Sequence, residues 1–223
     1  MVADFLLDIE GAWRWASDDA DAVTPAGARA VRASRGAAEA AEGPLAAPDF
    51  ASPQRPIRWV RDERALQTLC AELGRSGPFA LMVETTLRTR RLCLIQVGTP
   101  TVNALIDPLA VDDLSPLAGP LADTGAVTVT HDASQVVGVL ARLGLAVNGA
   151  IDVAALSRRR HGDDAEDGHG LAAIVRRELG RELDPTEAAS HWDRRPLTPA
   201  QEAHAALRVE VLLDLLEPLG AGG

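Results

Sequence analysis

The sequence predicts a mixed α/β domain in which helices flank a five-stranded sheet. Three short apolar runs, at residues 79 to 83, 92 to 97 and 103 to 106, are separated by compact connections typical of an antiparallel meander. Helix-like and strand-like segments then alternate, which is the pattern of a layered α/β architecture. With 223 residues, 47% of them hydrophobic, the chain is long enough to form one domain with a full core.

Helix signals bracket the first strands. Asp62 is a candidate N-cap, Gly74 is a stop signal, and apolar residues between them recur at helical spacing, which predicts a helix over residues 62 to 73. A second helix is expected over residues 112 to 121. The fourth strand of the sheet is expected over residues 126 to 130.

The following helices carry cap signals. Asp132 is expected to cap the helix that begins after His131, with Gln135 as its partner in a capping box. A short fifth strand is expected to end at Ile151, and the next helix to begin at Asp152.

Two more helices complete the predicted domain. One spans residues 171 to 179 and stops at Gly180. The other spans residues 199 to about 216, where Thr198 is the cap, proline is the first helical residue and Gln201 is the reciprocal partner.

A flexible N-terminal arm is predicted over residues 1 to 55, ahead of a folded domain at residues 56 to 219. Residues 16 to 55 are rich in Ala, Pro, Gly, Asp and Ser and follow neither the helical nor the strand period. An apolar cluster at residues 5 to 15 holds two of the four tryptophans. Three alternatives stay open for this cluster: it folds back on the domain, it binds a protein partner as a short helix, or it does neither. Its members are Phe5, Leu6, Leu7, Ile9, Trp13 and Trp15.

Composition argues against a membrane protein and against a general nucleic-acid binder. No apolar stretch approaches the length of a membrane span, and the first ten residues are acidic where a secretory signal is basic, so we expect a cytoplasmic protein. The net charge is -10, from 32 acidic residues and 22 arginines, with no lysine. Affinity for phosphate backbones comes mainly from basic groups, so a binding surface has to be local.

Eight arginines between residues 158 and 195 leave two alternatives open. Solvated helix faces are favoured over a track for phosphates. The eight are Arg158, Arg159, Arg160, Arg176, Arg177, Arg181, Arg194 and Arg195. The acidic, histidine-containing loop at residues 161 to 169 matches no established spacing of metal ligands and is expected to be solvated. Cys70 and Cys93 are expected to be buried thiols.

Five blocks in the folded region resemble the successive motifs of the ribonuclease D family. They lie at residues 88 to 97, 105 to 109, 131 to 135, 151 to 153 and 192 to 198, and the last, with Trp-x-x-Arg-Pro-Leu, is the most specific. The resemblance implies a ribonuclease H-like sheet flanked by helices, in the DEDD superfamily of 3′-5′ exonucleases. It covers roughly residues 57 to 219, and the helical domain that follows the nuclease in ribonuclease D is expected to be absent.

The resemblance also implies a site chemistry. Enzymes of this family hydrolyse a phosphodiester with two divalent ions, held about 3.5 to 4 Å apart by carboxylates from separate elements. Mg²⁺ or Mn²⁺ is suited to such oxygen ligands. In the family, an Asp-x-Glu pair on the first strand, an Asp in the second-motif helix and an Asp on the last helix supply the ligands. A Tyr one turn before the last Asp orients the attacking water.

Carried over to this chain, these positions retain one carboxylate. The Asp-x-Glu pair falls on Met82 and Glu84, and the second-motif Asp falls on Val136. On the last helix, the Tyr falls on His204 and the Asp on Arg208. Thioether, alkyl and guanidinium groups are not hard oxygen donors, so we expect no metal cofactor. Mg²⁺ or Mn²⁺ is required only if the chain is an active exonuclease.

The replacements suggest further roles for the site residues. Because an unpaired buried carboxylate is costly, we expect Arg208 to pair with Glu84; the alternative is an Arg208 that extends into solvent. His204 is a candidate base, although without metal it has little to assist. Three residues of the blocks that resemble the family are candidate contacts for nucleic acid: His131, Arg194 and Arg195.

The sequence as a whole predicts a catalytically inactive exonuclease-fold protein. Its expected partner is single-stranded nucleic acid, RNA more than DNA, or a protein bound through the arm, and no membrane. A structural or regulatory partner of another protein is a second hypothesis, favoured by the acidic charge. A residual metal-dependent 3′-5′ exoribonuclease is the third.

Overall fold

A computed structural model describes residues 5–7, 13–15, 49–73 and 77–220. The chain divides into two compact units, Met1–Leu45 and Ala46–Gly223. In the first unit, β1 (Phe5–Leu7) and β2 (Trp13–Trp15) pair as antiparallel strands, where one alternative expected a short helix. Ile9 and most of the predicted arm lie outside the described residues.

The second unit is built on a six-stranded sheet of order β3-β6-β5-β4-β7-β8. Its strands are β3 (Ile57–Val60), β4 (Phe79–Thr85), β5 (Leu92–Gly98), β6 (Asn103–Ile106), β7 (Thr128–Thr130) and β8 (Ala150–Asp152). The predicted antiparallel meander β4-β5-β6 is confirmed, and β3, β7 and β8 pair in parallel with their neighbours. The predicted count of five strands was wrong because β3, only four residues long and carrying an arginine, is too short to show a period.

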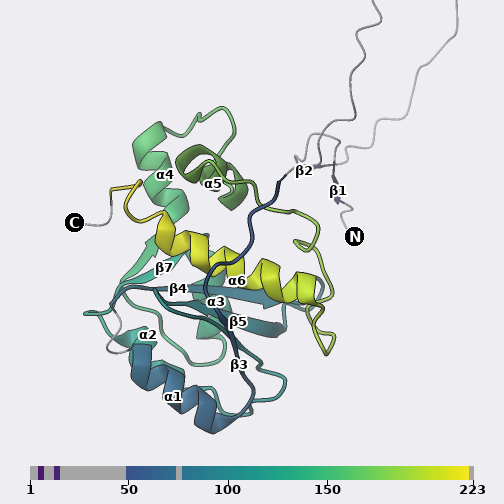
Figure 1. Cartoon of the computed structure of the whole chain (residues 1–223), viewed down its shortest axis with the longest axis vertical. Helices are drawn as coiled ribbons and strands as arrows, with labels where there is room; N and C mark the ends of the chain where they lie inside the picture. Colours follow the sequence, from purple (N-terminus) through teal and green to yellow (C-terminus); the bar gives the residue numbers. More distant parts are fainter. Residues whose placement is uncertain (1–4, 8–12, 16–48, 74–76, 221–223) are drawn as a thin grey trace, which may run out of the picture. The chain divides into compact units, whose positions relative to one another are not determined.

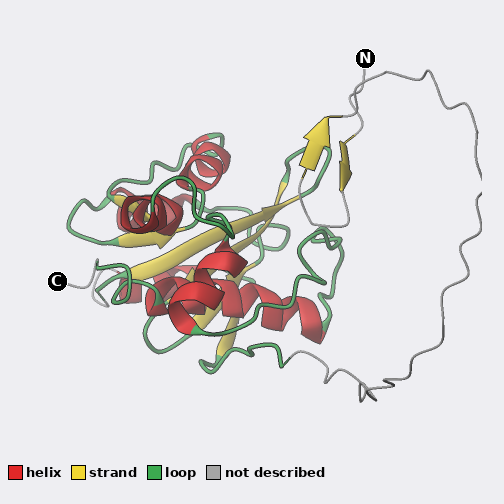
Figure 2. Ribbon diagram, turned by 90° about the horizontal axis from the view of Figure 1, so that it is seen from above, coloured by secondary structure: helices red, strands yellow, loops and turns green. Residues whose placement is uncertain are grey.

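Helices cover both faces of this sheet (Figures 1 and 2). They are α1 (Glu63–Leu73), the 3-10 turn η1 (Ser115–Leu117), α2 (Ala118–Ala122), α3 (Ala133–Ala141), α4 (Val153–His161), α5 (Leu171–Leu179) and α6 (Pro199–Asp214). The helix expected from residue 112 begins only at Ser115, because the Asp113 carboxylate accepts hydrogen bonds from the Ser115 N–H and hydroxyl ahead of it. No described helix is long and apolar enough to cross a bilayer.

The alternation of side chains along β4 divides the core into two layers. Phe79, Leu81 and Val83 pack with α1, α2 and α3, whereas Ala80 and Met82 pack with α5 and α6. Glu84 has the same parity as Met82 and therefore lies on the face that α6 covers. In Figure 1, α6 crosses the sheet on the side opposite to α1 and α2.

Most helix ends follow the local signals in the sequence. Asp62 accepts a hydrogen bond of 2.8 Å from the Ala65 N–H at the start of α1. Thr198 and Gln201 form the predicted capping box of α6. Gly180 ends α5 with a φ of 63°, in the left-handed region that glycine adopts readily.

The predicted cap at Asp132 was wrong. This residue has a φ of 58°, and its side chain accepts no hydrogen bond from the backbone of α3. Instead, the Asp152 carboxylate accepts from the N–H groups of Asp132 and Ala133, at 3.2 and 3.1 Å, and from that of Ala154 at 2.9 Å. Thr130 and Asp152 are partners in the β7-β8 ladder, so one carboxylate reaches the starts of both α3 and α4.

Residues 49 to 55, at the end of the predicted arm, are hydrogen-bonded to the domain. The Ala51 N–H donates to the Glu182 carbonyl at 2.9 Å. The N–H groups of Gln54 and Arg55 donate to the buried carboxylate of Glu210, each at 2.9 Å. This segment therefore runs along α6 before β3 begins.

Candidate functional site

A pocket of about 490 Å³ lies beside the second half of β4. β7 pairs with β4 only at Phe79 and Ala80, so the strand continues past its neighbour to Thr85. The wall of the pocket comes from this part of β4, the start of α3, the middle of α6 and the loop before α6.

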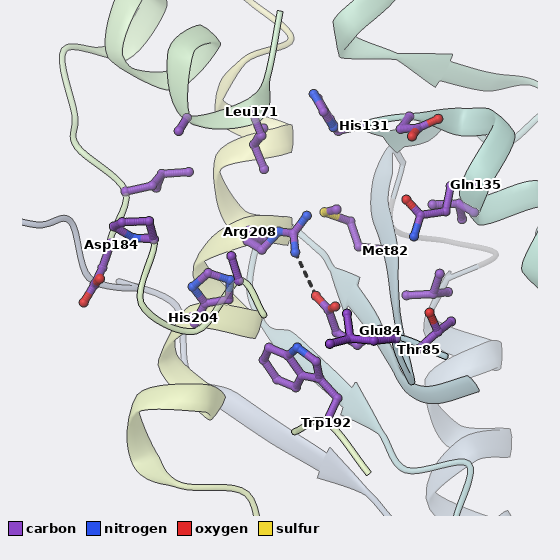
Figure 3. A pocket seen from close by; sticks show the side chains of 18 of the residues that line it. Met82, Glu84, Thr85, His131, Gln135, Leu171, Asp184, Trp192, His204 and Arg208 are labelled. Atoms are coloured by element: carbon purple, nitrogen blue, oxygen red, sulfur yellow. Dashed lines mark hydrogen bonds and ion pairs between the residues drawn. The ribbon is translucent and has the colours of Figure 1, made fainter. Parts of the chain in front are cut away.

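Six of the residues singled out in the sequence line this pocket. They are Met82, Glu84, His131, Val136, His204 and Arg208. Residues up to 126 positions apart are thereby brought together, as the resemblance implies, and Figure 3 shows five of the six with labels. Arg194 and Arg195 do not line the pocket.

Arg208 and Glu84 form an ion pair across the pocket, as predicted. Arg208 Nη1 donates to Glu84 Oε1 at 2.8 Å, drawn as the dashed line in Figure 3. Gln96 Nε2 donates to the same oxygen at 3.1 Å. The alternative in which Arg208 extends into solvent is wrong, because its side chain is only 23% exposed.

The charge of Glu84 depends on its neighbours. Burial raises the pKa of this carboxyl above its ordinary value, while the charge of Arg208 and the hydrogen bonds from Gln96 and Arg208 act in the opposite direction. Arg208 is therefore the main group that favours an ionised Glu84.

The donor set of the pocket does not fit a pair of hard divalent ions. One oxygen of Glu84 already accepts from Arg208 and Gln96. Asp132 and Asp184 also line the pocket, but no three His, Cys, Asp or Glu side chains among the described residues come together as metal ligands. A guanidinium stands where the family resemblance implies a carboxylate, and it cannot act as a ligand.

Trp192 and His204 present unmatched polar atoms in the pocket wall. Their rings lie 6.0 Å apart. Trp192 Nε1 and His204 Nε2 are buried and have no hydrogen-bond partner in the described part of the chain. Burial, and then the charge of Arg208, lower the pKa of His204, which favours its neutral form. Buried polar atoms are normally hydrogen-bonded, so this wall is suited to a polar ligand.

His131 is held at the rim by its own hydrogen bond. Its Nε2 lies 3.0 Å from the carbonyl oxygen of His169, at the end of the loop before α5. The His169 ring in turn lies 2.9 Å from the Ser157 hydroxyl on α4. This chain of contacts fixes the loop against the domain.

Arg195 acts as a positioning residue for the loop that carries Trp192. Its guanidinium binds both carboxylate oxygens of Asp107, at 2.6 and 2.8 Å. It also donates to the carbonyls of Cys93, Trp192 and Arg194. Burial raises the pKa of Asp107, but the hydrogen bonds from Arg195 and the Leu109 N–H, and the Arg195 charge, leave it below its ordinary value. These five contacts use all the N–H donors of the guanidinium.

The sequence analysis did not identify Gln96, Asp107 and Trp192 as residues of the site. Gln96 is a polar residue inside an apolar strand, and that interruption is a signal that it has a buried partner. Asp107 and Trp192 belong to blocks that resemble the family, but nothing in their spacing showed that Arg195 joins them.

The arginines and thiols outside the pocket have ordinary structural settings. Besides the Arg195–Asp107 pair, salt bridges join four more of the eight clustered arginines to acidic side chains, which supports solvated helix faces over a phosphate track. These pairs are Arg160–Glu178, Arg176–Asp167, Arg177–Asp167 and Arg181–Asp214. Both cysteines are free, Cys93 buried and Cys70 partly buried, and burial raises the pKa of Cys70 to about 11.

The sheet order, the helix across its face and the pocket beside β4 define a 3′-5′ exonuclease fold. Residues 57–221 match the family described as 3′-5′ exonuclease. The chain therefore belongs to the 3′-5′ exonuclease domain family, and the relatives below identify it as a ribonuclease D-like member.

Ribonuclease D from Shewanella sp. (strain ANA-3) is 33% identical over 169 residues, which are 73% of this chain and 42% of the relative. The crystal structure of Escherichia coli RNase D has a TM-score of 0.65 at 28% identity, covering 74% of this chain and 45% of that one. Trypanosoma brucei RNase D in complex with RNA U12 has a TM-score of 0.67 at 22% identity, covering 76% and 64%. The chain spans less than half the length of the curated ribonuclease D relatives from Shewanella sp. (strain ANA-3) and Pseudomonas paraeruginosa.

Proposed function

We propose that this ribonuclease D-like domain binds single-stranded RNA in its pocket and does not cleave it. The observation that carries the proposal is the ion pair between Arg208 and Glu84. It places a fixed positive charge beside the one carboxylate that the chain retains from the family pattern. The proposed location is the cytoplasm.

The loss of catalysis follows from coordination chemistry. Two-metal hydrolysis needs ions on both the attacking and the leaving oxygen, and each factor of ten in rate corresponds to about 1.4 kcal/mol. Met82, Val136 and Arg208 stand at three of the four ligand positions implied by the resemblance. Loss of several ligands at once removes the ions, and with them the activated water and the support of the leaving group.

Retention of RNA binding is supported by the pocket itself. Its volume of about 490 Å³ is within the range of small-molecule sites and is large enough for a nucleotide. Trp192 Nε1 and His204 Nε2 in its wall have no partner among the described residues. A fold relative, the RNase D of Trypanosoma brucei, was crystallised with RNA U12.

The test separates binding from cleavage. The full chain is incubated with 5′-labelled single-stranded RNA in Mn²⁺, with an active ribonuclease D as positive control, and products are separated on a denaturing gel. We expect no shortening. Fluorescence anisotropy with the same RNA in EDTA is expected to show saturable binding, and calorimetric titration with Mg²⁺ or Mn²⁺ to show no specific heat.

The alternative function is a residual metal-dependent 3′-5′ exoribonuclease. The retained Glu84, with Asp132 and Asp184 elsewhere in the pocket wall, is the observation that favours it. Mn²⁺-dependent shortening that disappears in Glu84→Gln would establish this alternative. Shortening that persists in Glu84→Gln would show that the cleavage does not depend on the retained carboxylate.

A protein partner is a second alternative, favoured by the net charge of -10. In that case the RNA assays give no binding, and a complex forms whose stability changes little with salt. Deletion of residues 1 to 15 would abolish such a complex if the apolar cluster of the arm is the contact.

A further inference from the structure

The connection between β4 and β5 is an exposed basic hairpin. Residues 86 to 91 read Thr-Leu-Arg-Thr-Arg-Arg, and Arg88, Arg90 and Arg91 are all exposed. None of the three forms a salt bridge with an acidic side chain among the described residues. In a chain with a net charge of -10, three unpaired positive charges within four residues are a local exception.

This hairpin borders the pocket. It continues directly from Glu84 and Thr85, and both Leu87 and Arg90 line the pocket wall. Leu87 is 72% exposed although it is apolar. A chain that enters the pocket beside β4 therefore passes the apolar side chain of Leu87 and the positive charge of Arg90.

The turn is held in shape by its own hydrogen bonds. The Thr86 N–H donates to the Arg91 carbonyl at 2.9 Å, and the Arg90 N–H donates to the Thr86 carbonyl at 3.0 Å. The Thr86 hydroxyl accepts from the Arg91 N–H at 3.0 Å and lies 2.5 Å from the Thr89 hydroxyl. The backbone is thus ordered without using the arginine side chains, which are left available for a partner.

Arg90 occupies a backbone conformation that suits glycine better. Its φ is 53°, in the left-handed region where a side chain is strained. The Arg90 side chain forms no hydrogen bond or salt bridge with the described residues, and strain at such a residue points to a role outside the fold. Binding of an anionic ligand by a positive charge at the mouth of the pocket is such a role.

We infer that the hairpin at residues 86 to 91 binds the phosphate backbone of single-stranded RNA whose end occupies the pocket. Arg88, Arg90 and Arg91 contact successive phosphates, and Leu87 covers a base at the pocket mouth. This inference rests on the proposed function and adds the surface by which an acidic protein holds a polyanion. The contacts are to phosphate and are therefore independent of base sequence.

The experiment compares two triple variants with the same change in charge. The first is Arg88→Ser, Arg90→Gly, Arg91→Ser. The matched control is Arg142→Ser, Arg158→Ser, Arg159→Ser, which removes three exposed arginines that do not line the pocket and form no salt bridge among the described residues. Binding of a fluorescent oligouridine to the full chain is measured by anisotropy in EDTA over a series of salt concentrations.

For the hairpin variant we expect roughly tenfold weaker binding at moderate salt, and a slope of log affinity against log salt that is smaller by about 2, from three phosphate contacts at about 0.7 each. The control variant is expected to retain the affinity and slope of the wild-type chain. Leu87→Ser is expected to weaken binding without changing the slope, because it removes a contact to a base and no charge.

The single variant Arg90→Gly separates a binding role from a folding role. Glycine relieves the strain at this φ, so the midpoint of urea unfolding is expected to stay the same or rise, while RNA affinity falls. A fall in both stability and affinity would assign Arg90 to the fold and overturn its role in binding.

Three other outcomes overturn the inference. An equal loss in both triple variants would show an effect of net charge and not of the hairpin. Wild-type affinity in the hairpin variant would show that RNA reaches the pocket by another surface, and would leave the proposed function intact. Absence of RNA binding by the wild-type chain would overturn the proposed function itself.

Discussion

At the scale of single residues, the ion pair of Arg208 and Glu84 links the sheet to α6. Glu84 is 8% exposed as a whole residue, and an ionised carboxylate at that depth is unfavourable without a partner. Arg208 on α6 supplies the opposite charge, and Gln96 on β5 supplies a second hydrogen bond to the same carboxylate. The pair offsets the cost of burying the charge and at the same time occupies the space beside Met82.

Replacing Arg208 with methionine is expected to destabilise the fold at neutral pH. Removal of one member of a fully buried pair costs about 3 to 5 kcal/mol, and partial exposure of Arg208 reduces the expected loss to about 1 to 3 kcal/mol. The free energy of unfolding from urea titration measures it. In the double variant Glu84→Gln, Arg208→Met most of the loss is expected to be recovered, since no buried charge remains.

The loss in Arg208→Met is expected to shrink as the pH falls. Burial already raises the pKa of Glu84, and without the opposing charge of Arg208 it rises further. Between the unfolded and folded pKa values, the native state binds more protons than the unfolded state, so the free energy of unfolding falls as the pH rises. The difference between variant and wild type is therefore largest above the folded pKa. A difference that grows on acidification would contradict this assignment.

Asp152 is expected to matter more for stability than Asp132. Its carboxylate accepts from three backbone N–H groups at the starts of α3 and α4. Asp152→Ala is expected to lower the free energy of unfolding by about 1 to 2 kcal/mol, as for the loss of a strong cap. Asp132→Gly serves as the control, because glycine suits its φ of 58° and no cap is lost. Equal losses in the two variants would restore Asp132 as the cap.

Local signals in the sequence predicted single residues well only where the partner is close along the chain. The capping box of Thr198 and Gln201 spans three residues and was predicted. The Arg195–Asp107 pair spans 88 positions and was not, because nothing in either segment specifies the other. The Arg208–Glu84 pair was predicted across 124 positions, since the resemblance placed both residues at one site.

At the scale of elements, α6 packs on β5 at a glycine. A Cβ on Gly98 would lie 2.8 Å from the Val209 carbonyl oxygen and 3.0 Å from the Val209 Cβ. The backbones of strand and helix therefore approach more closely there than any other residue would allow. Because Arg208 precedes Val209, this contact also sets the height of the arginine over the sheet.

The variant Gly98→Ala is expected to destabilise the domain by about 1 to 3 kcal/mol, since the added methyl has to displace the helix backbone. Gly138→Ala is the matched control. Gly138 lies inside α3, and a Cβ there meets no atom within 4 Å, so alanine is expected to stabilise by up to about 1 kcal/mol. Opposite signs in urea titration support the close approach, and a neutral Gly98→Ala contradicts it.

The elements were more predictable than their arrangement. Apolar runs and caps located β4, β5, β6, α5 and α6, because those signals are local. The strand β3 escaped detection, and its parallel pairing with β6 depends on contacts more than forty residues apart. The order of the six strands in the sheet was not predicted, because it depends on pairings between segments far apart in the chain.

At the scale of the whole molecule, the described part of this acidic chain has a basic surface beside the pocket that forms no salt bridges. Salt bridges occupy arginines on α4, α5 and α6, whereas the hairpin between β4 and β5 has none among the described residues. Net charge is thus a poor guide to the partner of this protein. The arrangement favours a ligand that is recognised at the pocket and its rim.

Restoring the family's carboxylates is expected to restore metal binding to the whole domain. The triple variant Met82→Asp, Val136→Asp, Arg208→Asp places three carboxylates around Glu84. Without metal they repel one another, so the melting temperature in EDTA is expected to fall below that of the wild type. A bound ion stabilises the native state by about 2.7 kcal/mol at a hundred times its Kd, so Mn²⁺ is expected to raise the melting temperature of the variant. The wild-type chain, in which Arg208 already neutralises Glu84, is expected to melt at the same temperature with and without Mn²⁺. A metal-dependent rise in the wild type would show that its pocket binds the ion despite the guanidinium.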